Sequence, residues 1–134
     1  MSFSVHRDDF SAPFFDAAAS GSLLIRRCPR CGRHYPPQQR RCPDGEEAEW
    51  APAAGTGVLV TWGVEHGPPP DPDLAGPDGA TSVFGYVELD EGPWYPAAIV
   101  DADPASLAAG DQMAVKFLRL GDGEPVPVFA PPAS

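Results

Sequence analysis

Three cysteines in this sequence have the spacing of metal-binding thiols. Cys28-Pro-Arg-Cys31-Gly is a Cys-x2-Cys-Gly turn, in which backbone N–H groups point at the sulfurs while both side chains reach one metal ion. Zinc takes four ligands in a tetrahedron, so a structural zinc ribbon needs a second such turn. Cys42-Pro-Asp-Gly45 has the first cysteine and the proline of that turn, but position 45 is glycine. The sequence therefore predicts a zinc ribbon that lacks one ligand.

The predicted metal ligands are the thiolates of Cys28, Cys31 and Cys42. Three nearby side chains could complete the shell, and Asp44 is the candidate we name first, followed by Glu46 and His34. Without such a ligand, the ribbon would persist without metal and be held by packing. A third interpretation is that the three residues are ordinary buried cysteines, which the Cys-x2-Cys-Gly pattern disfavours.

Positive charge is concentrated around these cysteines. Six of the nine basic residues lie between positions 26 and 41, where no acidic residue occurs, and the net charge of the whole chain is −10. They are Arg26, Arg27, Arg30, Arg33, Arg40 and Arg41. The acidic remainder disfavours a general nucleic-acid binder, because phosphate repulsion would oppose the gain at the basic segment. A small polyanion or an acidic protein surface fits better. The alternative is that these arginines only solubilise the ribbon and pair with neighbouring acids.

No catalytic residue is expected. The sequence contains no nucleophile with a paired base at a recognisable spacing, no phosphate loop and no paired carboxylates in an apolar setting. His66 ends a predicted strand beside a proline-rich loop, and we interpret it as a loop residue rather than a general base. The cysteines are assigned to the ribbon.

Length and composition limit the elements that can position these residues. At 134 residues the chain is one domain or a small module attached to one domain, and its 18 Pro and 14 Gly favour short strands joined by turns. Three cysteines in a metal-type spacing do not suggest disulfides, so a reducing cytoplasm is expected. The sequence lacks a signal-peptide pattern at its start and has no apolar run of membrane-spanning length, so we expect no membrane association.

A short helix is predicted before the ribbon. Ser11 can cap it, Gly21 can end it, and Phe10 and Phe15 stand at the positions of a hydrophobic staple. A helix of about ten residues is not stable alone in water. Its phenylalanines must therefore cover the ribbon or dock on another protein, and both alternatives stay open.

Short strands account for the rest of the chain. Residues 23–27 and His34-Tyr35 should form two strands of a three-stranded ribbon within residues 22–45. Five further strands are predicted at residues 55–66, 82–89, 94–100, 113–120 and 126–129. Residues 67–79 are expected to be a loop, 121–123 a turn, and 104–107 a helical turn between the third and fourth of these strands. This order indicates an OB-type barrel. Trp50, Trp62 and Trp94 are interpreted as barrel core, with a stacking platform as the alternative.

The order of motifs resembles the family known as domain of unknown function thirty-five. It runs from a Phe-Phe helix ending in Gly-Ser-Leu-Leu, through Cys-Pro-x-Cys-Gly, Tyr-Pro-Pro and Cys-Pro, to Gly-Thr-Gly-Val-Leu-Val-Thr-Trp, Val-Glu-Leu-Asp-Glu-Gly and Gly-Asp before Val-Lys-Phe. The match extends from about Phe14 to Phe129. The resemblance implies a mainly β fold with an N-terminal helix (1–21), a rubredoxin-like zinc ribbon missing one ligand (22–49) and a five-stranded OB-fold barrel (50–134). Gly45 departs from the family pattern, which has its fourth cysteine there.

The resemblance also implies a function. The chain would be a non-catalytic accessory subunit of a thiolase-superfamily enzyme, with an acyl-CoA thioester as the substrate of the complex. The enzyme would be a thiolase, a condensing enzyme or an aldolase that shortens CoA-linked steroid side chains, in an α2β2 heterotetramer; relatives fused to an acyl-CoA hydratase subunit make that a second candidate partner. Arg30, Arg33, Arg40 and Arg41 are then candidates for contacts with CoA phosphates or with the partner. The alternative is a single-strand nucleic-acid-binding OB module.

Overall fold

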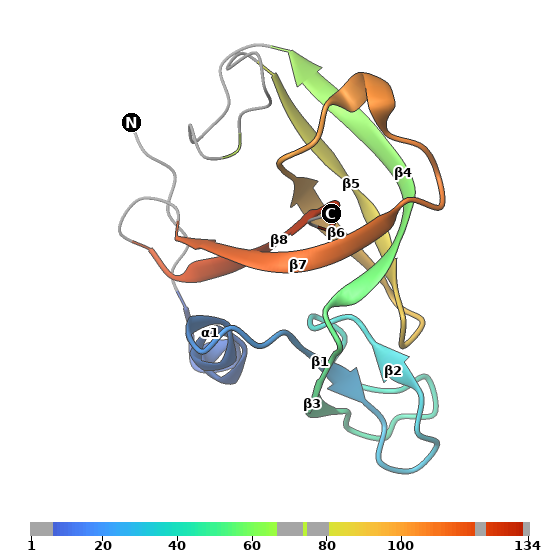
Figure 1. The fold of residues 1–134 in the computed structure, drawn as a ribbon. Coiled ribbons are helices and arrows are strands. Elements are labelled where there is room, and N and C mark those ends of the chain that lie inside the picture. The colour runs from blue at the N-terminus through green and yellow to red at the C-terminus, as the bar shows by residue number, and fades with distance from the viewer. Residues whose placement is uncertain (1–6, 67–73, 75–80, 120–122, 133–134) are drawn as a thin grey trace.

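A helix, a small three-stranded sheet and a closed five-stranded barrel follow one another along the chain (Figure 1). The computed structural model describes residues 7–66, 74, 81–119 and 123–132. The predicted mainly β class and OB-type barrel are confirmed. Apart from Leu74 and Gly123, the predicted loop at 67–79 and turn at 121–123 lie outside the described residues.

The helix packs onto the rest of the chain. It is α1 (Ala12–Ala19), and Gly21 follows it with a φ of +83°, a left-handed conformation that glycine adopts readily. Phe14 and Phe15 are buried, with ring centroids 5.2 Å apart, and join the main hydrophobic core. Of the two alternatives for these phenylalanines, burial within the chain is the one observed. No helix in the described ranges is long and apolar enough to cross a bilayer.

Two details predicted for the start of this helix are wrong. Ser11 precedes the helix, but its backbone is near-helical (φ −96°, ψ −5°), and its side chain makes no capping bond. Its Oγ instead lies 2.9 Å from Oδ1 of Asp8 and accepts a bond from the Asp8 N–H. Phe10 is 62% exposed, and Arg40 lies over its ring, so Phe10 is not the buried end of a staple.

The ribbon sheet has the order β2-β1-β3, with both outer strands antiparallel to β1. Its strands are β1 (Leu24–Arg27), β2 (His34–Tyr35) and β3 (Glu49–Pro52). The first two were predicted, but the third lies beyond the 22–45 range. The chain between Cys42 and Ala48 forms the second cysteine turn. An isolated β-bridge between Arg41 and Glu47 helps to close this turn. Only after that turn is the chain extended beside β1.

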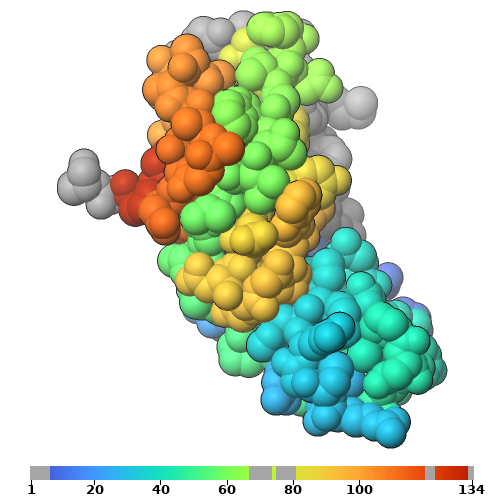
Figure 2. All heavy atoms as spheres, turned by 90° about the vertical axis from the view of Figure 1, so that its right-hand side faces the viewer, coloured from blue at the N-terminus to red at the C-terminus, as the bar shows by residue number. Residues whose placement is uncertain are grey.

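The barrel closes in the order β4-β5-β6-β8-β7, with β6 and β8 parallel and the other neighbours antiparallel. The strands are β4 (Thr56–His66), β5 (Thr81–Leu89), β6 (Trp94–Ile99), β7 (Gln112–Arg119) and β8 (Pro125–Ala130), with the short helix η2 (Pro104–Ser106) between β6 and β7. All five predicted strands and the helical turn are confirmed. Figure 2 shows the ribbon as a lobe at one end of the barrel.

One core joins the helix, the ribbon and the barrel. Phe129 and Val87 at 0% exposure are its centre in the barrel, and the helix phenylalanines extend it toward the ribbon. Trp50 and Trp62 are partly buried against this core, although Trp50 lies in the ribbon sheet. The prediction is wrong for Trp94, which is 50% exposed because it points outward from β6 and its indole N–H donates to Glu88 Oε2 (3.0 Å).

Candidate functional site

The three cysteines come together at the tip of the ribbon. Their Sγ atoms all lie within 4.8 Å of one another, and those of Cys31 and Cys42 are 3.7 Å apart. Cys28 and Cys42 are buried, whereas Cys31 is exposed. Two turns hold them, one closed by the Gly32 N–H donating to the Cys28 carbonyl and one by the Gly45 N–H donating to the Cys42 carbonyl, each at 2.8 Å.

This donor set fits zinc. A zinc–sulfur bond of about 2.3 Å in a tetrahedron separates neighbouring sulfurs by about 3.8 Å, close to the 3.7 Å between Cys31 and Cys42. Soft thiolates select zinc among the common divalent ions of cells. Cys28, Cys31 and Cys42 would hold the ion, which would cross-link the two cysteine turns.

The candidates for a fourth protein ligand do not join the cluster. Within the described ranges, no further His, Cys, Asp or Glu atom lies in the group of mutually close donors. Asp44 is nearest in the chain, but its Oδ1 accepts the Glu46 N–H at 3.0 Å. This bond is the main cause that holds the pKa of Asp44 below its usual range, and a bond with Cys42 is the second cause.

Sequence reasoning missed Tyr35 as a member of this site. Its hydroxyl lies 3.2 Å from Cys42 Sγ, and this hydrogen bond is the main cause that raises the pKa of Tyr35 to about 12. The phenol therefore keeps its proton and can donate to a thiolate. A cavity of about 230 Å³ opens here, lined by Cys31, Arg33, Tyr35, Cys42, Pro43 and Asp44. The tyrosine is seven positions from the cysteine, and their contact depends on how β2 and the second cysteine turn come together.

The metal content of the purified protein tests this assignment. After expression with zinc supplied, elemental analysis should find at most one zinc per chain, because there is one cluster of thiols in the described part. Cys28→Ser should remove the ion, since its sulfur is buried between the two turns. His34→Ala should keep the zinc content of the parent, because His34 lies outside the cluster. Full zinc content in Cys28→Ser would contradict the ligand set.

The arginines of the basic segment make different contacts. Arg40 lies over the Phe10 ring at 4.2 Å, and Arg41 Nη1 donates to the Gly45 carbonyl at 3.2 Å. Arg33 lines the thiol cavity, and both Arg33 and Arg30 are exposed. In the described residues, the side chains of Arg30 and Arg33 make no hydrogen bond or ion pair, although the charge of Arg30 helps to lower the pKa of Asp44. Arg27 pairs with Glu49.

Arg26 makes contacts within the chain that were not expected. Its guanidinium lies 3.6 Å from the centre of the Trp50 ring, and its Nε donates to the Pro37 carbonyl at 2.9 Å. Burial lowers its pKa, and the charge of Arg40 adds to this effect. Arg26 and Arg40 both line a cavity of about 340 Å³ where the helix, ribbon and barrel meet. The stacked pair is 24 positions apart in sequence, so no local spacing reveals it.

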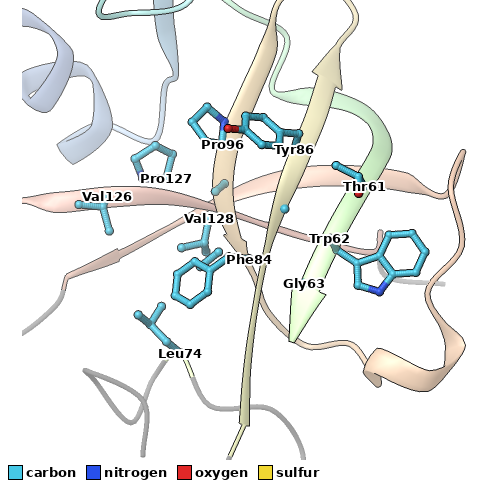
Figure 3. A pocket seen from close by; sticks show the side chains of 13 residues that line it. Thr61, Trp62, Gly63, Leu74, Phe84, Tyr86, Pro96, Val126, Pro127 and Val128 are labelled. Atoms are coloured by element: carbon cyan, nitrogen blue, oxygen red, sulfur yellow. The ribbon is translucent and has the colours of Figure 1, made fainter. Parts of the chain in front are cut away.

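An apolar groove of about 530 Å³ lies on the outer face of the barrel. Phe84 and Tyr86 are 40% and 44% exposed and project outward from β5, while Val83 and Val87 point into the core. Figure 3 shows Phe84, Leu74 and Val128 turned toward the same hollow, with the Trp62 indole pointing away from them. The period-two pattern of this strand could have revealed the outward aromatic residues.

The fold and the cysteine cluster define a zinc-ribbon and OB-fold protein. Two family descriptions match the chain, "ChsH2, rubredoxin-like zinc ribbon domain" at residues 15–46 and "ChsH2, C-terminal OB-fold domain" at residues 50–118. A ChsH2 chain from the solved Ltp2-ChsH2(DUF35) aldolase superposes with a TM-score of 0.76 and 30% identity, over 96% of this chain and 98% of that one. This protein therefore belongs to the ChsH2 (DUF35) family.

Two other proteins show how far the likeness extends. A DUF35-family protein of unknown function from Sulfolobus solfataricus has a TM-score of 0.56 at 11% identity, over 93% of this chain and 85% of that one, which shows the shared fold. A Thermomonospora curvata protein named "Probable enoyl-CoA hydratase alpha subunit" is 31% identical over 129 residues. The alignment covers 95% of this chain but spans only 38% of that protein.

Proposed function

We propose that this chain is a non-catalytic accessory subunit of a thiolase-fold enzyme that acts on acyl-CoA. The observation that carries the proposal is the full-length likeness to the ChsH2 chain of an Ltp2-ChsH2 aldolase. The T. curvata relative, named as a hydratase subunit, supports acyl-CoA as the substrate class and makes an acyl-CoA hydratase a second candidate partner. In this proposal the partner carries the catalytic residues, and the small protein stabilises the complex and covers the CoA entrance.

The finer assignments are also proposals. We place the complex in the cytoplasm as an α2β2 assembly, because a two-fold symmetric thiolase dimer offers two equivalent surfaces for one copy each. A retro-aldol reaction on a CoA-linked side chain, such as that of a steroid, is the reaction we favour. The nucleic-acid alternative is disfavoured by the placement of the groups. The exposed aromatic residues Phe84, Tyr86 and Trp94 lie on the barrel, whereas the basic segment at residues 26–41 lies on the ribbon.

Co-expression with thiolase-fold proteins encoded beside it tests the proposal. The pure chain should show no thiolase, hydratase or aldolase turnover, while a co-purified complex should have the activity and contain both subunits in equal numbers. Size-exclusion chromatography and a coupled acyl-CoA assay measure the two expectations. A pure chain that turns over acyl-CoA on its own, in preparations from independent hosts, would reject the accessory role.

A further inference from the structure

The two cysteine turns are the same turn, with one residue deleted from the second. In the first turn, Gly32 has a φ of +78°. The Cys28 N–H donates to the carbonyl of Arg33, the residue that follows Gly32, at 2.9 Å. In the second turn, Gly45 has a φ of +92°. The Cys42 N–H donates to the carbonyl of Glu46, the residue that follows Gly45, at 2.8 Å. Gly45 is therefore the counterpart of Gly32, and Cys31 has no counterpart.

This equivalence changes the meaning of the missing ligand. Three residues separate Cys28 from its turn glycine, but only two separate Cys42 from Gly45. The fourth cysteine is thus deleted rather than replaced, and no thiol stands at its place. Three protein ligands with a further open position are typical of zinc sites that exchange a ligand, whereas structural sites are closed by four.

We propose that the metal held by Cys28, Cys31 and Cys42 takes its fourth ligand from solution, and that this ligand is a small aliphatic thiol bound in the cavity beside Tyr35 and Arg33. The cavity of about 230 Å³ lies against Cys31 and Cys42. One water molecule occupies roughly 30 Å³ of liquid, so the cavity has room for a ligand of several heavy atoms. A site already made of soft thiolates favours a fourth soft donor over an oxygen.

The charge balance for a thiolate at this position depends on Arg33. Three thiolates already outweigh the two charges of a zinc ion, and a fourth adds one more negative charge. Arg33 lines the cavity and supplies positive charge there, while the Tyr35 hydroxyl is already paired with Cys42 Sγ. Asp44 also lines the cavity, and its carboxylate opposes an anion there, so the positive charge of Arg33 must offset it. On binding, the thiol proton passes to the buffer and a sulfur–metal bond forms, with no electron transferred.

Cobalt(II) makes this binding visible, because thiolate-to-cobalt charge-transfer bands grow with the number of sulfurs. We would load the full chain with cobalt(II) under anaerobic conditions and titrate it with 2-mercaptoethanol. The band should rise saturably by about one third, as three sulfurs become four. Acetate at equal concentration should leave it unchanged. A flat titration with cobalt still bound, or cobalt lost from the protein on ultrafiltration, would overturn the proposal.

Two sets of variants sharpen the test. A chain with one cysteine inserted between Asp44 and Gly45 should show the four-sulfur spectrum without added thiol and no response to it. A thiol response equal to that of the parent would count against the proposal. Arg33→Glu should weaken thiol binding roughly fivefold, whereas Lys116→Glu, the same charge change on the barrel, should not. Equal affinities for these two variants would exclude Arg33 from the site, and this pair decides the matter even if the insertion fails to fold.

Discussion

Replacing Gly57 with alanine should lower the free energy of unfolding by about 3 kcal/mol. Gly57 lies on β4 between β5 and β7, paired with Leu89 and Met113. A Cβ there would lie 2.9 Å from Val87 Cγ1 and closer still to the Glu88 carbonyl oxygen. Because the second atom belongs to the backbone of a paired strand, it cannot move away without opening the barrel. Urea unfolding followed by circular dichroism measures the loss.

Gly63→Ala on the same strand is the matched control. A Cβ at Gly63 would meet no atom within 4 Å, and this glycine does not have a positive φ. Replacing Gly63 with alanine should leave the free energy of unfolding almost unchanged, or raise it by about 0.5 kcal/mol, because alanine lowers the conformational entropy of the unfolded chain. Equal losses for the two variants would mean that the close approach at Gly57 is absent in solution. A loss at Gly57 alone would locate the constraint near the start of β4, just after the chain passes from the ribbon to the barrel.

The sequence predicted the strands better than the sheets to which they belong. Alternation and turn residues located all five barrel strands, because these are local signals. Trp50 was assigned to the barrel, yet β3 pairs with β1 in the ribbon. An extended segment looks the same in either sheet, and only a pairing over more than twenty residues distinguishes them. Local patterns therefore established the fold class but not the limit of the ribbon.

The candidate site shows the same division. The spacing of Cys28, Cys31 and Cys42 identified the cluster, since neighbouring turns position these side chains. The spacing could not show that Gly45 is a turn glycine, because this follows from its φ and from the Cys42 hydrogen bonds. Tyr35 was missed for another reason. Its contact with Cys42 depends on how a strand and a turn come together, which composition does not specify.

Reversing the charges of Arg30 and Arg33 together should weaken assembly with the thiolase-fold partner roughly a hundredfold at low salt. Both side chains are exposed, and neither makes a hydrogen bond or ion pair with the described residues, so the double variant Arg30→Glu/Arg33→Glu should melt like the parent. These two positive charges stand out on a chain with a net charge of −10, and they would attract an acidic partner surface or the phosphates of CoA.

Sedimentation of the mixed subunits at several salt concentrations measures the assembly, and the apparent KM for acyl-CoA distinguishes the two kinds of anion. Contact with the partner predicts loss of complex, while contact with CoA phosphates predicts an intact complex with a raised KM. Lys116→Glu/Arg119→Glu on β7 is the control with the same change in net charge.

The effect on assembly is read from the complex, whereas thiol binding at Arg33 is read from the isolated chain, so the two roles are measured separately. If the arginine variant assembles and turns over like the parent, the basic segment is only a solvated surface; if the parent forms no complex at all, the proposed function is wrong.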